Sequence, residues 1–282
     1  MGGEVSPSHG YMNMIPAWKK RKEEEFTIFA SSLFPEGKMP DMAQRKLEHT
    51  FDVCRIAERL LREEEEFARI PASDVLGYYC ALFHDISRFE QLLRFSTLRD
   101  PDSFDHGDRS REILEEGIFP IPEELSPQQK GILLAAIGFH NKKTLPVDLP
   151  REVLPFARLI RDADKLSILK VVMKAFSDPE ACREGTVSFG LPWDAPYTKS
   201  IAEKAIAGEM IDYTTLRCVD DFKISLFVWP VDLAFPASAR LAMEEKLFER
   251  FAEYLPEDPL MKKLKERCLA GLQLLAEKKE RK

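Results

Sequence analysis

The sequence predicts an all-α fold, and three observations lead to that class. Apolar residues recur at helical spacing through most of the chain, and several prolines stand where a helix can begin. No run alternates polar and apolar residues long enough to predict a strand with assurance, and only Thr186–Leu191 leaves room for a short hairpin. The expected architecture is therefore a helical bundle.

Composition limits the classes of protein that the chain can belong to. Its 282 residues are 44% hydrophobic and 32% charged, which suits one large domain or a core with an extension. The net charge of −7, without a long basic block, argues against bulk nucleic acid as a partner. The five cysteines are scattered, no window suits a membrane helix, and the N-terminus lacks a secretory signal. A cytoplasmic protein with no membrane partner is expected.

The second predicted helix carries a histidine that points inward. Residues 1–40 form an N-terminal segment that packs on the core through a helix opening at Pro16 and ending before the break at 34–37. The next helix should run from Asp41, as its cap, to Glu66, with Glu63–Glu66 as a solvated end. His49 shares a face with the apolar Val53, Ile56 and Leu60, so it points inward.

Two further histidines stand near predicted helix ends. After Pro71, Ser73 or Asp74 can cap a helix that is apolar nearly all round and ends in His84-Asp85. Residues 94–105 read as a polar loop. His106 follows at the junction between this loop and a short helix.

The last two unusual positions lie on the next helices. Ser126-Pro127 opens a helix whose apolar stripe leads to His140. A long helix from about 152 to 176 carries Asp164 within an apolar stripe. Residues 41–176 are therefore predicted as the core.

The C-terminal part should extend the same domain. Residues 177–198 are rich in glycine and proline and read as a long excursion. Helical stretches follow at about 197–209, 214–229 and 236–276, the last with a break near Pro256 and Pro259. Residues 177–282 are predicted to be a helical extension that completes the bundle.

Four histidines and two aspartates form a series that calls for a common explanation. The series is His49, His84, Asp85, His106, His140 and Asp164. One histidine on an apolar face is more often a hydrogen-bonded core residue than a ligand. Four inward histidines with two buried aspartates are harder to explain in that way, because buried charges are usually paired or bound to metal.

This series resembles the HD superfamily of metal-dependent phosphohydrolases, with His…His-Asp…Asp spread over three helices and the two intermediate histidines of the two-metal type. The resemblance covers about residues 40–175 and implies an HD-domain helical bundle. It also implies that His49, His84, Asp85 and Asp164 hold a first metal, and that Asp85 bridges to a second held by His106 and His140. Mixed imidazole and carboxylate ligands suit Fe, Mn, Co, Ni or Zn.

Basic and polar neighbours of the series are candidates for substrate binding. They are Arg88, Arg109, Ser110, Asn141, Lys142, Lys143 and Lys165. Phosphate recognition requires Arg or Lys near the metals, although each such residue singly is more often a surface charge. Arg88 and Lys165 are preferred, with Asp85, as catalytic residues, because each lies within a turn of a ligand.

The expected function is hydrolysis of a phosphate ester, which can be a nucleotide, a cyclic dinucleotide or a small phosphomonoester. The Gly-Tyr-Pro signature of one HD subfamily and the acidic pair of another are both missing. A di-iron oxygenase of the same superfamily has the same ligand pattern, so it stays open as the alternative. A metal-bound sensing or scaffold protein ranks last. The expected partner is a small phosphorylated substrate, and a homodimer stays open.

Overall fold

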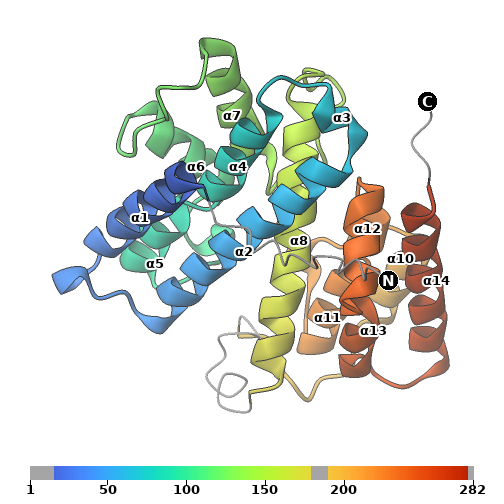
Figure 1. Ribbon diagram of the computed structural model, residues 1–282. Coiled ribbons are helices and arrows are strands. Elements are labelled where there is room, and N and C mark those ends of the chain that lie inside the picture. Colours follow the sequence, from blue (N-terminus) through green and yellow to red (C-terminus); the bar gives the residue numbers. More distant parts are fainter. Residues whose placement is uncertain (1–15, 179–189, 279–282) are drawn as a thin grey trace, which may run out of the picture.

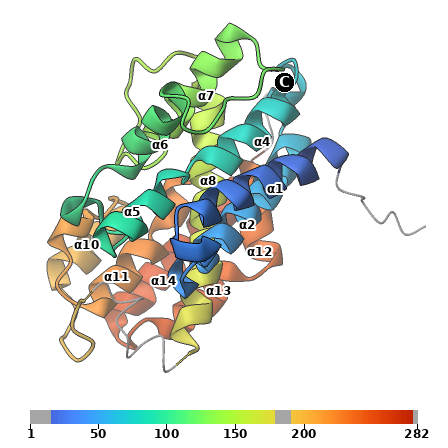
Figure 2. The same ribbon diagram turned by 90° about the vertical axis from the view of Figure 1, so that its left-hand side faces the viewer.

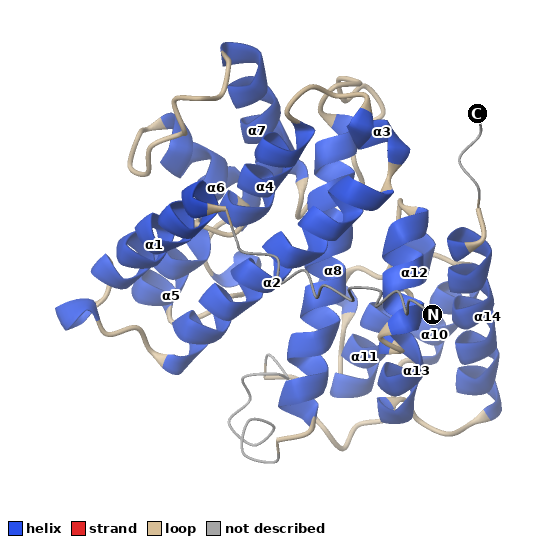
Figure 3. Cartoon of the chain, viewed as in Figure 1, coloured by secondary structure: helices blue, strands red, loops and turns tan. Residues whose placement is uncertain are grey.

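The computed structural model describes residues 16–178 and 190–278, and in these ranges every regular element is a helix (Figure 3). The all-α class is thereby confirmed. The predicted hairpin at 186–191 falls mostly outside the described residues. None of the described helices is both long and apolar enough to cross a membrane.

The helices before residue 178 form one side of the molecule and its centre (Figure 1). They are α1 (Ala17–Ser32), α2 (Asp41–Glu63), α3 (Glu65–Ala68), α4 (Ser73–Phe83), α5 (Ser87–Phe95), α6 (His106–Glu115), α7 (Pro127–Phe139) and α8 (Leu154–Phe176). In the core, α2 packs against α4 and α8, while α7 packs against α6 and α8. Helix α8 is thus in contact with α2, α4 and α7, which all lead to residues of the series.

The helices after residue 190 pack on the other side of α8 (Figures 1 and 2). They are α10 (Lys199–Ala207), α11 (Val219–Phe227), α12 (Pro236–Glu244), α13 (Leu247–Phe251) and α14 (Pro259–Ala276). A 3₁₀ helix, η4 (Trp229–Asp232), joins α11 to α12 and packs on α14. The break near Pro256 and Pro259 is present, and a second one falls at Lys246, whose φ is 51°.

Helix α1 packs on the core through aromatic side chains. Phe26 is fully buried and its ring contacts those of Phe83, Phe89 and Phe119 at centroid distances of 5.8–6.3 Å. The hydroxyl of Tyr78 donates a hydrogen bond to Glu23 Oε1 at 2.8 Å. These contacts join α1 to α4 and α5, next to the helix end that carries His84.

The predicted helix of 41–66 is interrupted, and the prediction of a solvated end was wrong for Glu64. This residue has an extended backbone between α2 and α3 and its side chain is buried. Its Oε1 accepts a hydrogen bond from the Ala237 backbone N–H at 2.6 Å, in the first turn of α12. A carboxylate there satisfies a free N–H and suits the helix dipole. Glu64 therefore attaches the C-terminal helices to α2.

Two predicted helix caps were wrong. Pro40, not Asp41, takes the position before α2, and Asp41 is the first helical residue. Ala72, with φ of 53°, precedes α4, while the Ser73 hydroxyl donates to the Phe67 carbonyl instead of capping the helix. By contrast, Ser126 caps α7 as predicted, with Pro127 at the first position and Gln129 completing a capping box.

Candidate metal centre

The fold brings all six residues of the series together in one buried cluster. His49 lies in the middle of α2 and Asp164 in the middle of α8. His84 and His140 each follow the last residue of a helix, α4 and α7, and His106 is the first residue of α6. Their ligand atoms form three overlapping groups in which all atoms lie within 4.8 Å of one another. The cluster could therefore hold metal ions.

Asp85 stands at the centre of this cluster, and its two carboxylate oxygens face different histidines. Oδ2 lies 3.7 Å from His49 Nε2 and 3.4 Å from His84 Nε2. Oδ1 lies 3.5 Å from His106 Nε2 and 3.7 Å from His140 Nε2. We call His49, His84 and Asp164 group I, and His106 and His140 group II. Asp85 faces both groups, one through each carboxylate oxygen.

Each histidine presents Nε2 to the cluster because Nδ1 is engaged elsewhere. In His84 and His140, Nδ1–H donates to the carbonyl three residues earlier, at Ala81 and Ile137, each at 2.7 Å. Carbonyls in the last turn of a helix lack the usual helical partner, and these two are satisfied by an imidazole, at Ile137 together with the His140 backbone N–H. His106 Nδ1 lies 2.5 Å from Asp100 Oδ2, and His49 Nδ1 shares a hydrogen bond of 2.9 Å with Ser167 Oγ. Partners of this kind fix the tautomer of metal-binding histidines.

Several polar atoms of the cluster are buried without a well-aligned hydrogen bond. They are His84 Nε2, Asp85 Oδ1, and the pair His49 Nε2 and Asp164 Oδ1, which lie within 3.0 Å of each other. Burying these atoms in one place is costly, and metal ions would satisfy them together.

Some ligand atoms also have the spacing that a metal requires. His49 Nε2 and Asp164 Oδ1 lie 3.0 Å apart, and the Nε2 atoms of His106 and His140 lie 3.2 Å apart. Two adjacent ligands of an octahedral ion, with bonds of about 2.1 Å, would lie about 3.0 Å apart. The donor set and these spacings therefore fit divalent metals.

Electrostatics keeps most of these ligands in the deprotonated form that metals bind. Burial opposes ionisation of Asp85, but the charges of Lys46, His84 and Arg88 hold its pKa well below the usual value. Burial, together with Arg88, lowers the pKa of His106 to about 4. Burial and Lys46 also lower the pKa of His49. His84 differs, because the charge of Asp85 outweighs burial and raises its pKa.

Arg88, one of the preferred basic residues, lies at the cluster. Its Nε is 3.4 Å from Asp85 Oδ1 and its Nη2 is 3.3 Å from His106 Nε2. Its Nη1 donates to Asp100 Oδ1 at 3.0 Å. Asn141 supports the same place, since its Nδ2 donates to Asp100 and Asp105 behind His106. Arg88 is therefore held against the cluster, and its role in binding a substrate stays a prediction.

Four further candidates, three basic side chains and Ser110, contact other partners in the described structure. Arg109 contacts Glu90, Glu112 and Glu116, and Lys142 bridges Asp105 and Asp108. Lys143 lies 3.6 Å from Asp212. Ser110 bonds to Ser87, which joins α6 to α5. Roles for these four in substrate binding stay predictions.

Lys165 is buried, but the carboxylate it contacts is Asp232 of η4, at 2.8 Å. Asp232 Oδ2 also accepts from Arg161, whose guanidinium donates to the His140 carbonyl at 3.1 Å. These contacts join α8, the end of α7 and the C-terminal helices. A catalytic role for Lys165 stays a prediction.

Sequence reasoning missed two residues at the cluster. Lys46 Nζ lies 2.5 Å from Asp85 Oδ2, and its position one turn before His49 was a usable signal. Asp100 contacts His106, Arg88 and Asn141 from η2 (Asp100–Asp102), a 3₁₀ helix within the stretch predicted as a polar loop, which gave no signal of its own. Both residues contact the predicted ligands directly.

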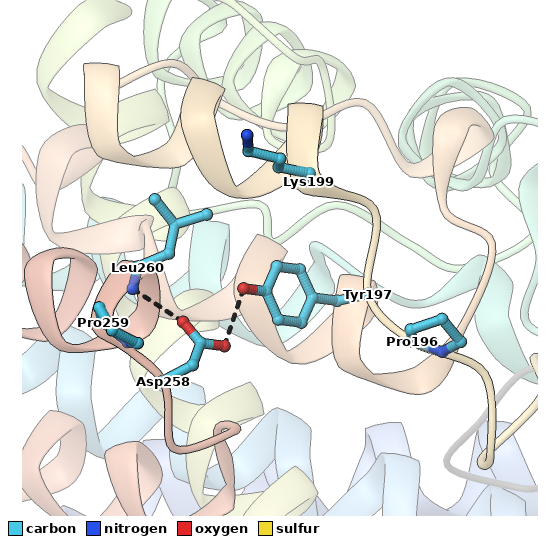
Figure 4. A pocket seen from close by; sticks show the side chains of 6 residues that line it. All are labelled: Pro196, Tyr197, Lys199, Asp258, Pro259 and Leu260. Carbon is cyan, nitrogen blue, oxygen red and sulfur yellow. Dashed lines mark hydrogen bonds between the residues drawn. The ribbon is translucent and has the colours of Figure 1, made fainter.

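A surface depression lies away from the cluster, between the starts of α10 and α14 (Figure 4). The Tyr197 hydroxyl donates to Asp258 Oδ2 at 2.8 Å. Asp258 Oδ1 accepts from the Leu260 and Met261 backbone N–H groups. The carboxylate is thus already used to cap α14 and shows no sign of a ligand site.

Comparisons with known proteins identified no relative of this chain. No family model matches the chain, and searches of curated proteins and of solved structures found no significant match.

Proposed function

We propose that the protein is a metal-dependent phosphohydrolase of the HD type, which uses two divalent transition metals to hydrolyse a phosphate ester. The observation that carries this proposal is Asp85, whose two oxygens each face a separate set of histidines. The His…His-Asp…His…His…Asp order, which resembles the two-metal HD proteins, supports the same proposal.

Each part of the cluster would have its own role in binding metal and substrate. Group I and Asp85 would hold one ion, and group II and Asp85 the other. Two divalent ions would supply a hydroxide nucleophile at neutral pH and neutralise charge on the phosphoryl group. Asp85 would contribute one carboxylate oxygen to each of the two sites. Arg88 would bind a phosphoryl oxygen, because its Nε is buried without a hydrogen-bond partner and faces the cluster.

Hydrolysis of the ester needs no covalent intermediate with the protein. The oxygen of water joins phosphorus while the bond from phosphorus to the ester oxygen breaks, and the alcohol leaves with a proton. The six residues of the cluster include no serine or cysteine nucleophile, so water activated by metal is the nucleophile that fits the cluster.

A substrate panel tests the proposal. The metal-free protein is loaded in turn with Mn, Fe, Co, Ni or Zn and assayed with phosphomonoesters, nucleotides and cyclic dinucleotides. We expect release of phosphate or ring opening in at least one combination, and none for Asp85→Asn. A protein that binds metal and leaves the whole panel intact would contradict the proposal.

The same ligand set suits a di-iron oxygenase, and a second assay separates the two functions. Oxygen uptake by the iron-loaded protein with a polyol or a phosphonate would favour the oxygenase. Retention of Mn or Ni alone from the cell would count against it.

A further inference from the structure

The exposed edge of the cluster carries two positive charges, one on each side of Asp85. Lys46 Nζ lies 2.5 Å from Asp85 Oδ2, and Arg88 Nε lies 3.4 Å from Oδ1. Their side chains are 15% and 13% exposed, whereas that of Asp85 is 3% exposed. Both cations are thus in contact with the buried carboxylate and more exposed to solvent than it is.

Neither cation can keep its present contacts unchanged when ions occupy the cluster. The Nδ1–H of His106 faces Asp100, so its Nε2 has a single lone pair, and Arg88 Nη2 lies 3.3 Å from that atom. An ion bound to His106 takes this lone pair. An ion on Asp85 Oδ2 would likewise repel the ammonium of Lys46. Among the described residues, Asp85 is the carboxylate that Lys46 contacts. Lys46 would then need another anion, while Arg88 would keep Asp100 on its Nη1 and have its Nε and Nη2 free to bind one.

Charge balance indicates which anion that is. Asp85 and Asp164 together offset the charge of one divalent ion, and Asp100 offsets that of Arg88. A second divalent ion and Lys46 leave a surplus of positive charge. A hydroxide together with a doubly charged terminal phosphate would remove it, whereas a singly charged diester or a neutral polyol would not.

We propose that Lys46 and Arg88 bind the phosphoryl group of the substrate from the two sides of Asp85 and select a terminal, dianionic phosphate. This inference rests on the proposed function and narrows its substrate to phosphomonoesters. Lys46 is a substrate-binding residue in this account, and its contact with Asp85 is exchanged for the phosphate when metal is bound.

Calorimetric titration tests this inference without relying on turnover. Inorganic phosphate is titrated into the Mn-loaded protein, and Mn into the metal-free protein, for wild type, Lys46→Gln and Arg88→Gln. Loss of a charge-assisted contact should weaken phosphate binding about 10- to 100-fold. Lys46→Gln should bind Mn at least as tightly as wild type, because it removes a competing cation. Lys46→Arg, which keeps the charge, should recover part of the phosphate affinity.

Matched controls come from ion-paired side chains away from the cluster. Lys170→Gln removes a lysine of α8 that contacts Glu245 at 2.8 Å, and Arg59→Gln removes an arginine held by Glu63 and Glu244. Both should leave phosphate and Mn affinity within about twofold of wild type. If Lys46→Gln loses Mn, or binds phosphate as wild type does, the inference is wrong.

Competition between two small esters tests the selection of the dianion. Methyl phosphate should displace inorganic phosphate at least about tenfold more effectively than dimethyl phosphate, and Lys46→Gln should narrow that difference. Equal displacement would overturn the selection. A protein that shows this pattern but hydrolyses no ester would contradict the proposed function and leave the binding inference standing. If the protein hydrolyses an ester and Lys46→Gln leaves that hydrolysis unchanged, the proposed function stands and the binding inference is contradicted.

Discussion

The two halves of the cluster are built in different ways. In group I, His49 and Asp164 lie within α2 and α8, two long helices that pack on each other and on α4. In group II, both histidines stand at helix ends, as His84 of group I does, and His106 directly follows a loop. Group I is thus part of the helical core, whereas group II depends on a loop for the placement of one ligand.

The partners behind the ligands differ in the same way. His49 Nδ1 is bonded to a neutral hydroxyl, that of Ser167, three residues after Asp164 on α8. His106 Nδ1 is bonded to the Asp100 carboxylate from the preceding loop. A carboxylate behind an imidazole strengthens it as a ligand. Group II therefore has a charged partner behind one ligand where group I has a neutral one. We expect the metal affinity of group II to respond more strongly to substitutions around it.

Removal of the shared ligand should have the largest effect. Asp85→Asn keeps the shape of the side chain but removes the charge that both groups face. We expect retention of neither ion after desalting and loss of phosphohydrolase activity to below detection, measured by elemental analysis and product release. Full metal content in this variant would show that the two groups do not share Asp85.

The next largest effect is expected at Asp100. Asp100→Ala removes the carboxylate behind His106, and loss of such a partner typically costs 10–100-fold in metal affinity. Titration of the metal-free protein should show one weakened site and one unchanged site. Asp102→Ala, at an exposed aspartate of the same 3₁₀ helix, serves as the control. Equal weakening of both sites would contradict the division into groups.

A smaller effect is expected at Gly107. A Cβ at this position would collide with the Asn141 side chain, which supports Asp100 and His106 from behind. Gly107→Ala should weaken the group II site several-fold and leave group I intact. Gly131→Ala of α7, where a Cβ would meet open space, should leave both sites unchanged. The same titration measures both variants.

The smallest effect is expected at Ser167. Ser167→Ala removes one neutral hydrogen bond from His49, a contact worth about 1 kcal/mol, or roughly fivefold in affinity. The metal affinity should fall at the group I site alone, measured by the same titration. A loss as large as that of Asp100→Ala would show that the helical core does not fix His49 by itself.

The sequence predicted those parts of the site that lie on regular helices. His49 and Asp164 stand in apolar stripes, and His84 and His140 follow such stripes directly, so their inward direction could be read from spacing alone. The resemblance to HD proteins then supplied a common role for them and for His106.

Contacts between distant segments could not be read in that way. Asp100 lies in η2, a single turn between α5 and α6, and its side chain bonds to Gln91, Arg88 and His106. Glu64 was predicted to be solvated because its partner, Ala237, is 173 residues away. For Lys165, nearness in sequence to Asp164 did not place it at the cluster, because successive residues of a helix point in different directions.

The most direct test of a two-metal cluster shared by Asp85 is the metal content of two single variants. His49→Ala and His106→Ala are purified beside wild type, loaded with Mn, desalted and analysed for metal per protein. The account predicts two ions in wild type and about one in each variant, with the surviving ion held by group II in the first and by group I in the second. The addition of Asp100→Ala should lower the remaining metal content of His49→Ala and leave that of His106→Ala unchanged. A single ion in wild type that both variants lose would contradict the account.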